Sequence, residues 1–239
     1  MSAPIRSSVV VVAAGRGERC GGAPKQFRRL RDRPLLLHSV DALVHLPGLT
    51  ELIVVLPSEA PSPPEVETGL RRLAEDYPAV AFGTAPGGPR RQDSVAAGLE
   101  ALTRACDVIL VHDAARPFPP IEPTGRAIEK AAEGGGAILA VRATETLKRA
   151  DDQGRILETV GREAIWLAQT PQAFRAEYRE GLVRWLKSSQ VLTDEASALE
   201  KLGVPVVLVE GSALNLKVTT EADFKTAERE AGRPPQSSD

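Results

Sequence analysis

The sequence has few of the residues that mark disulfide-stabilised, metal-binding or membrane proteins. It contains two cysteines in 239 residues, Cys20 and Cys106, which match neither a disulfide framework nor the spacing of a metal site. Both are expected to be free thiols in a reducing compartment. No apolar run reaches the roughly 18 residues that span a bilayer, and residues 1–6 contain no apolar stretch of a secretory signal. These absences predict a cytoplasmic protein with no membrane partner.

An excess of one charge is also missing. Lys and Arg total 30 and Asp and Glu total 32, so the chain as a whole has no field that would hold nucleic acid. Any anion must therefore be bound by a local cluster of basic side chains. With 42% hydrophobic and 26% charged residues, the composition is that of an ordinary globular protein. The length predicts one domain over residues 1–230, followed by a disordered polar tail at 231–239.

The apolar residues form short runs that alternate with helical patterns. Runs that are apolar throughout, as in strands covered by helices on both faces, lie at 8–13, 52–56, 80–83, 108–112, 137–141 and 206–209. Apolar residues at helical spacing occur at 34–46, 65–75, 93–102, 121–132, 174–186 and 195–202, and a last helix starts near Thr220. This order predicts an α/β fold with a mostly parallel twisted sheet and helices on both faces. Its ligands should bind in loops at the carboxyl ends of the strands.

Residues 142–162 depart from this alternation. Two short strand-like segments, 144–148 and 156–160, flank the sequence DDQG at 151–154, which predicts a protruding β-hairpin arm. A lone hairpin is only marginally stable in water, so the arm is expected to pack on another surface. A partner subunit is the favoured candidate, and the body of the same chain is the alternative.

The loop after the first predicted strand is the most informative segment. Its small residues at 13–17 leave backbone N–H groups open to form an anion-binding concavity. Positive charge is added by Arg16, Arg19 and Lys25. A triphosphate wrapped by backbone amides is the favoured ligand, and solvated basic residues on a Gly-rich turn are the alternative. A dinucleotide fingerprint would place its third glycine at Cys20, and a P-loop would need Ser or Thr after Lys25, so neither motif fits.

The loop sequence at 13–26, AAGRGERCGGAPKQ, resembles the signature of the 2-C-methyl-D-erythritol 4-phosphate cytidylyltransferases. Further segments are similar to this family in the same order: 87–95 (GGPRRQDSV), 111–117 (VHDAARP), 170–172 (TPQ), 192–197 (LTDEAS) and 215–219 (NLKVT). The resemblance covers about residues 8–228 and implies a Rossmann-like nucleotidyltransferase fold. It also implies transfer of CMP from CTP to methylerythritol phosphate, with release of pyrophosphate, in non-mevalonate isoprenoid biosynthesis. A ribitol 5-phosphate cytidylyltransferase is the nearest alternative; a nicotinamide-dependent Rossmann oxidoreductase and a non-catalytic nucleotide sensor are more distant.

The resemblance implies roles for individual residues as well. The transition state would be stabilised by Arg19, Lys25 and Lys217. CTP would contact Ala13, Ala14, Gly15, Gly17, Gly88, Ser94 and Asp113. The acceptor would contact Asp113, Ala114, Arg116, Thr146, Arg162, Thr170 and Thr193. Of these, Thr146 and Arg162 would reach into the site from the arm of the other subunit of a homodimer. Mg²⁺ or another divalent cation would be held mainly by the triphosphate, with no metal site built from protein side chains.

The implied chemistry needs no general base, because the nucleophile is a phosphate oxygen that is already ionised near neutral pH. It does need two polyanions in position and stabilisation of charge at the α-phosphorus. His112 is therefore interpreted as structural, and an Asp113–Arg116 ion pair is the alternative to substrate roles for those two residues. Pro89 departs from the family pattern and has no N–H, so only its carbonyl could contact a base.

The basic residues in or beside these loops predict a cationic cavity inside a nearly neutral molecule. They are Arg16, Arg19, Lys25, Arg90, Arg91, Arg116, Arg162 and Lys217.

Overall fold

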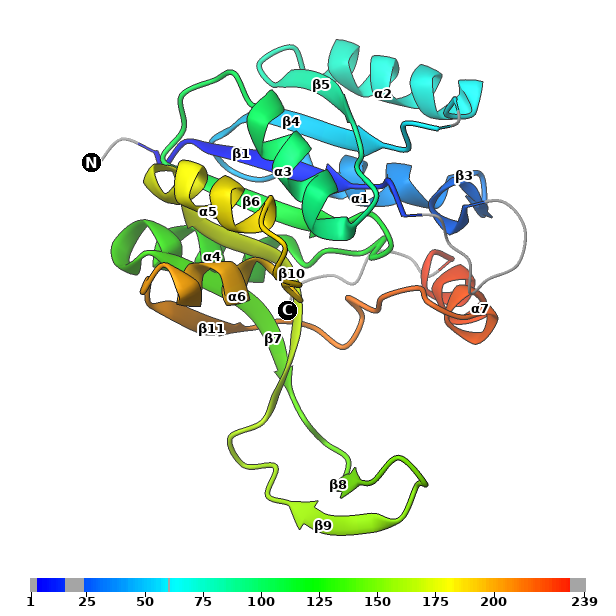
Figure 1. The fold of residues 1–239 in the computed structure, drawn as a ribbon. Coiled ribbons are helices and arrows are strands. Elements are labelled where there is room, and N and C mark those ends of the chain that lie inside the picture. The colour runs from blue at the N-terminus through cyan, green and yellow to red at the C-terminus, as the bar shows by residue number, and fades with distance from the viewer. Residues whose placement is uncertain (1–3, 16–23, 60, 233–239) are drawn as a thin grey trace.

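A seven-stranded sheet forms the centre of the computed structural model, which describes residues 4–15, 24–59 and 61–232 (Figure 1). The strand order is β11-β7-β10-β6-β1-β4-β5. The bounds are β1 (Ser7–Val12), β4 (Leu49–Leu56), β5 (Ala81–Pro86), β6 (Val108–Asp113), β7 (Gly136–Arg142), β10 (Trp166–Arg175) and β11 (Val206–Glu210). Strand β10 runs antiparallel to β6 and β7, whereas the other neighbouring pairs are parallel. The predicted mostly parallel α/β sheet is confirmed.

Helices cover both faces of this sheet. One apolar layer is formed with α1 (Leu35–Leu43), α2 (Pro64–Asp76) and α4 (Ile121–Gly134), and the other with α3 (Arg91–Ala101), α5 (Arg179–Leu186) and α6 (Glu195–Lys201). In β1, Val9 and Val11 face the first layer and Val10 the second, and all three are 0% exposed. The strands β1, β4 and β6 are mostly apolar because both of their faces are buried. Within the described ranges, no helix is both long and apolar enough to cross a membrane.

The C-terminal helix α7 (Glu221–Glu230) begins after its N-cap Thr220, as predicted. It packs beside the short elements that follow the first loop, which are η2 (Lys25–Phe27), β2 (Arg29–Leu30) and β3 (Arg33–Pro34). Phe224 of α7 shares an apolar cluster with Leu30 and Val218, and the guanidinium of Arg28 lies 4.0 Å from the Phe224 ring centroid. This packing holds the segment before α7 close to the first loop. Of the predicted tail, residues 233–239 lie outside the described residues.

The sequence patterns missed the central strand β10. The helix predicted over 174–186 is wrong at its start, because β10 continues to Arg175, a 3-10 turn η3 (Ala176–Tyr178) follows, and α5 begins only at Arg179. β10 carries Gln169, Thr170 and Gln172, which are polar yet buried. Their partners lie in other segments, including the Ala196 N–H that donates to Gln172 at 2.9 Å. Buried polar residues with distant partners hide the apolar signal of a central strand.

The predicted hairpin arm is present. Strands β8 (Leu147–Ala150) and β9 (Ile156–Val160) pair antiparallel, although the first begins at residue 147 rather than 144. Figure 1 shows the arm projecting from the body below β7 and β10. Ile156 and Leu157 are 64% and 62% exposed, so the alternative in which the arm packs on its own body does not match the structure.

Candidate active site

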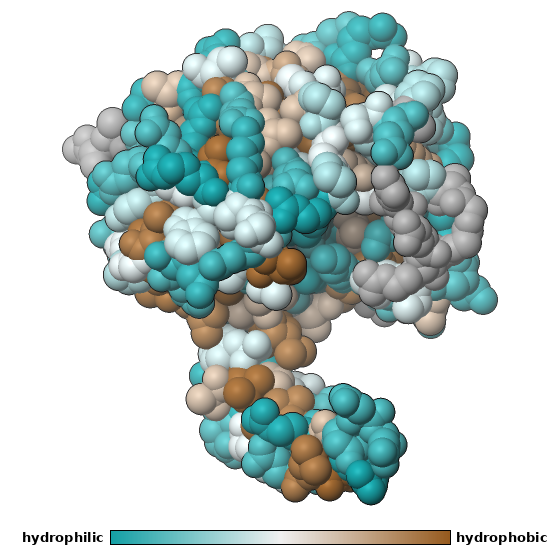
Figure 2. Space-filling view, viewed as in Figure 1, coloured by the Kyte–Doolittle hydropathy of each residue, from teal (hydrophilic) through white to brown (hydrophobic). Residues whose placement is uncertain are grey.

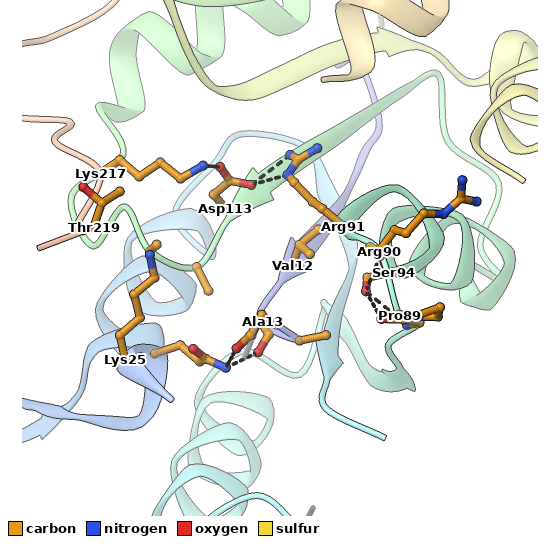
Figure 3. A pocket seen from close by; sticks show the side chains of 16 residues that line it. Val12, Ala13, Lys25, Pro89, Arg90, Arg91, Ser94, Asp113, Lys217 and Thr219 are labelled. Atoms are coloured by element: carbon orange, nitrogen blue, oxygen red, sulfur yellow. Dashed lines mark hydrogen bonds and ion pairs between the residues drawn. The ribbon is translucent and has the colours of Figure 1, made fainter. Parts of the chain in front are cut away.

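A cavity of about 400 Å³ opens at the carboxyl ends of β1 and β6, where ligands of such sheets bind. Its described lining comprises Val12, Ala13, Ala14, Gly15, Lys25, Gln26, Gly88, Pro89, Arg90, Arg91, Ser94, Asp113, Ala114, Ala115, Lys217 and Thr219. These residues come from four separate parts of the sequence. Figure 3 shows Lys25 and Lys217 on one side of the cavity and Ser94 and Pro89 on the other.

The first loop enters the cavity through a backbone that a buried amide holds in place. Gln26 is buried, and its Nε2 donates to the carbonyl oxygens of Ala13 at 2.7 Å and Gly15 at 2.9 Å. Ala13, Ala14 and Gly15 therefore reach the cavity as expected for backbone contacts to a ligand. Arg19 and Gly17, together with Arg16, lie outside the described residues.

The Ser94 side of the cavity is shaped by a close approach of two backbone segments. The Gly88 N–H donates to the Ser94 hydroxyl at 3.1 Å. A Cβ on Gly87 would collide with the side chain of Ala14, so the loop can pass here only as glycine. Pro89 lines the cavity beside them and offers no N–H.

The charged side of the cavity is organised around Asp113, the last residue of β6. Lys217 Nζ lies 2.7 Å from its Oδ2, and the Arg91 guanidinium lies 2.8 Å from its Oδ1 (Figure 3). Burial opposes ionisation of this carboxyl, but the cations of Arg91 and Lys217 outweigh burial and hold the pKa of Asp113 well below its usual range. Asp113 is therefore a carboxylate at any physiological pH.

The alternative in which Asp113 pairs with Arg116 is wrong for the described residues. The ion partners of Asp113 are Arg91 and Lys217. Arg116 instead donates from Nη1 to the carbonyl oxygen of Asn215 at 2.6 Å, while its Nε is buried without a hydrogen-bond partner in the described part of the chain. Arg116 thus contacts the segment that carries Lys217, and its Nε is a donor that no described residue satisfies.

Lys25 approaches the same segment from the first loop. Its Nζ donates to the carbonyl oxygen of Val218 at 2.7 Å, and both Lys25 and Lys217 line the cavity. Asp223 fixes the next residue, because its Oδ2 accepts from the Thr219 N–H at 2.8 Å and from the Thr219 hydroxyl at 2.7 Å. These bonds lower the pKa of Asp223 to about 2. The N-terminus of α7 thereby positions the two lysines relative to each other.

Thr170 contacts the backbone of Asp113, and His112 contacts Thr170. The Thr170 hydroxyl accepts the Asp113 N–H at 3.0 Å and lies 3.1 Å from His112 Nδ1, and His112 Nε2 lies 3.0 Å from the carbonyl oxygen of Arg116. His112 is 0% exposed, and burial lowers its pKa to about 4. The structural interpretation of His112 agrees with this environment, and Thr170 reaches Asp113 rather than the cavity.

The remaining residues expected at the acceptor are spread over the molecule. Thr193 lies just before α6, where its hydroxyl donates to Asp194 at 3.4 Å. Thr146 and Arg162 belong to the arm. The Nη1 atom of Arg162 donates to the carbonyl oxygen of Thr144. None of these three is among the described residues that line the cavity.

The predicted clustering of basic residues is partly visible. Four of the eight line the cavity, namely Lys25, Arg90, Arg91 and Lys217. Arg90 is paired with Asp93, and Arg91 with Asp113 and Glu195, so carboxylates already balance the charge of both arginines. Arg116 lies next to the cavity, Arg162 lies on the arm, and the other two fall outside the described residues.

Sequence reasoning counted Arg91 among the basic residues of the expected cavity without giving it a role, and it did not single out Glu195. Arg91 pairs with Asp113 and with Glu195, whose side chain is 0% exposed. Both stand inside segments that carry the family resemblance, yet 104 residues separate Arg91 from Glu195. Their contact forms where folding brings the first residues of α3 and α6 together, and it leaves no pattern in the sequence.

Comparisons with known proteins agree with this geometry. Residues 7–231 match the model of the IspD family, 2-C-methyl-D-erythritol 4-phosphate cytidylyltransferase. The chain belongs to this family. The enzyme of that name from Azoarcus sp. (strain BH72) is 41% identical over 231 residues, which cover 93% of each chain. A crystal structure of the same-named protein from Thermus thermophilus superposes with a TM-score of 0.74 at 31% identity, covering 93% of this chain and 97% of that one.

Some relatives are longer than this chain. The "Bifunctional enzyme IspD/IspF" of Rhizobium leguminosarum bv. trifolii (strain WSM2304) is 38% identical over 232 residues, which are 94% of this chain but 56% of that protein. The chain thus spans a little over half the length of such bifunctional relatives. Membership of the IspD family confirms the resemblance and the fold, and it leaves the nicotinamide-dependent alternative without support.

Proposed function

We propose that the chain transfers CMP from CTP to 2-C-methyl-D-erythritol 4-phosphate and releases pyrophosphate, as a step in non-mevalonate isoprenoid biosynthesis. The observation that carries the proposal is the cavity at the ends of β1 and β6. It places two lysines on one side and the Gly88–Ser94 contact on the other (Figure 3). A triphosphate needs cations at one end, and a base needs fixed hydrogen-bonding groups at the other.

The proposed mechanism is positioning and charge stabilisation. A phosphate oxygen of the acceptor attacks the α-phosphorus, and pyrophosphate leaves in line. Lys25 and Lys217 would neutralise the charge that develops on the phosphate oxygens; the same role is expected for Arg19. Asp113 is not suited to accept a proton, because both of its oxygens already accept from cations. This arrangement supports a reaction without a protein base.

CTP would be read on the Ser94 side of the cavity. The backbone of Ala13, Ala14 and Gly15 and the Gly88–Ser94 pair provide donors and acceptors in fixed positions. At Pro89 only the carbonyl can take part. Specificity for cytosine over uracil would come from these groups.

A divalent cation, Mg²⁺ for example, fits the donor set when it is carried by the triphosphate. Among the described residues that line the cavity, Asp113 is the one acidic side chain, and no group of three or more His, Cys, Asp or Glu comes together elsewhere in the described ranges. Lys25 and Lys217 would hold the nucleotide that carries the cation. When bound, the cation would neutralise phosphate charge.

The acceptor site is proposed to be completed across a homodimer. Thr146 and Arg162 of one arm would then bind the phosphate of an acceptor held by Asp113, Ala114, Arg116 and Thr193 in the other subunit, where Thr170 would act through Asp113. Figure 2 shows apolar surface on the arm and where it joins the body, in keeping with the exposure of Ile156, Leu157 and Leu167. A two-stranded hairpin with such residues needs a second surface to pack on.

Subunit mixing tests this arrangement. Arg162→Glu and Lys25→Ala chains are each expected to be inactive as homodimers. A hybrid dimer joins one intact arm to one intact lysine loop, so one of its two sites should work. Equal mixing should restore about a quarter of wild-type activity, because about half of the dimers are hybrids. No recovery, with subunit exchange demonstrated by mass spectrometry, would contradict the shared site.

The acceptor is tested by measuring pyrophosphate release with CTP and Mg²⁺ in the presence of methylerythritol phosphate or ribitol 5-phosphate. We expect a higher kcat/KM with methylerythritol phosphate. A preference for ribitol 5-phosphate would favour the alternative cytidylyltransferase, and no release with either would favour a nucleotide sensor. A cytoplasmic location stays a prediction from the sequence.

A further inference from the structure

Four side chains of alternating charge run from the buried start of α6 into the cavity. Glu195 Oε1 lies 2.8 Å from Arg91 Nη1, the Arg91 guanidinium lies 2.8 Å from Asp113 Oδ1, and Asp113 Oδ2 lies 2.7 Å from Lys217 Nζ. Side-chain exposure is 0% at Glu195, 32% at Arg91, 11% at Asp113 and 40% at Lys217. The row therefore leads from the buried Glu195 to Lys217, which lines the cavity.

Arg91 is the rigid member of this row. Its Nε donates to Asp113 at 2.9 Å, while Nη1 and Nη2 donate to the two oxygens of Glu195 at 2.8 and 3.2 Å. A planar guanidinium held on two sides by carboxylates has little rotational freedom. Arg91 starts α3, Asp113 ends β6 and Glu195 starts α6, so one side chain ties together three elements.

Stability alone does not explain such a row. Charged groups lose much hydration on burial, and replacing a buried ion pair by apolar residues of similar volume is often neutral or stabilising. A single lysine beside a freely rotating aspartate would, by contrast, leave the ammonium poorly placed. Misplacing a group by about 1 Å can lower a rate about a hundredfold. The benefit of the row is thus a fixed position for Lys217.

We propose that Arg91 and Glu195 are positioning residues for nucleotidyl transfer: Glu195 holds Arg91, Arg91 orients the Asp113 carboxylate, and Asp113 holds Lys217 against the α-phosphate. The inference rests on the proposed function and adds two residues to it. Neither residue needs to touch the reacting atoms, because each acts through its neighbour in the row.

The first experiment separates positioning from folding. Arg91→Met strands the buried Glu195 charge and should lower the melting temperature, whereas the double variant Arg91→Met/Glu195→Gln removes that charge and should recover most of the stability. We expect kcat of the double variant to stay down by about a hundredfold, with KM for CTP near the wild-type value. Arg6→Met, which breaks an exposed ion pair with Asp107 on another part of the body, is the matched control. It should change neither kcat nor KM for CTP.

Return of kcat together with stability in the double variant would overturn the inference, since Arg91 would then be merely structural. A rise in KM for CTP without a fall in kcat would also overturn it, because Arg91 would then bind the nucleotide directly.

The second experiment asks whether Arg91 acts through Lys217. The Arg91→Met/Glu195→Gln change is introduced into wild-type and Lys217→Met backgrounds, and kcat is compared in a double-mutant cycle. We expect the hundredfold loss of kcat to disappear in the Lys217→Met background. If the fold-losses of kcat from the two changes simply multiply, the inference is refuted while the proposed function stands. A wild-type chain that released no pyrophosphate in the same assay would instead refute the proposed function, and this inference with it.

Discussion

The structure predicts that acid destabilises the protein through His112. The ring is 0% exposed, and the Thr170 hydroxyl, which accepts the Asp113 N–H, lies 3.1 Å from His112 Nδ1. His112 Nε2 donates to the carbonyl oxygen of Arg116 at 3.0 Å. Protonation of His112 is opposed by burial, which outweighs the hydrogen bonds at Arg116 and Thr170 that favour the charged ring.

The size of this effect follows from the pKa of His112. An unfolded histidine binds its proton near a pKa of about 6.5, whereas the pKa of folded His112 is about 4. Between these values the unfolded state holds more protons, so the free energy of unfolding falls as pH falls. The full span is worth about 3 kcal/mol, of which about 2 kcal/mol should be lost between pH 7 and pH 5. Above the unfolded pKa the contribution is fully present.

Urea unfolding followed by tryptophan fluorescence at pH 7 and pH 5 measures this loss. His112→Gln cannot titrate at this position, so its free energy of unfolding should fall by about 2 kcal/mol less than that of the wild type over the same interval. His45→Gln is the matched control, because His45 lies exposed against Tyr77, and it should keep the wild-type pH dependence. An identical pH dependence in His112→Gln and wild type would refute the reasoning.

Three further predictions concern the cavity and the backbone. Lys25→Ala and Lys217→Ala should each lower kcat by about a hundred- to a thousandfold in steady-state assays, with a smaller effect on KM; unchanged kcat would remove that lysine from the mechanism. Ser94→Ala removes a hydroxyl that accepts a backbone N–H at 3.1 Å and should weaken the preference for CTP over UTP, and an intact preference would exclude base reading by this hydroxyl. Gly48→Ala forces a Cβ at φ +70 against a backbone carbonyl and should cost about 1–3 kcal/mol in urea unfolding, whereas Gly125→Ala in α4 meets open space and should not destabilise; equal effects would contradict the backbone argument.

The central sheet could be predicted from sequence because burial on both faces leaves a direct mark. The valines at 9–12 can serve only as a buried strand, and the runs at 108–112 and 137–141 behave alike. β10 left no such mark. Gln169 donates to the carbonyl oxygen of Ser212 at 2.8 Å and Gln172 accepts from Ala196, so their burial depends on partners that folding brings near. Periodicity contains no information about such partners.

The same limit applies to the site. The loops that reach the cavity could be found because they follow predicted strands, and the resemblance named Asp113 and Lys217 within them. The alternative to a substrate role for Asp113 paired it with Arg116, three residues away, whereas the structure pairs it with Arg91, 22 residues away. Short sequence separation favours such a guess, but the packing of α3 beside the end of β6 decides the pair. Charge pairs between elements need the structure.

The most direct test of the proposed function follows the α-phosphate of CTP. The full chain is incubated with α-³²P-labelled CTP, Mg²⁺ and methylerythritol phosphate, and pyrophosphate release is measured beside the fate of the label. We expect one pyrophosphate for each labelled phosphate that appears in a CMP–methylerythritol phosphate product, and loss of both signals when the acceptor is omitted. Label that remains in CTP, or that appears as free CMP while the acceptor is unchanged, would contradict it.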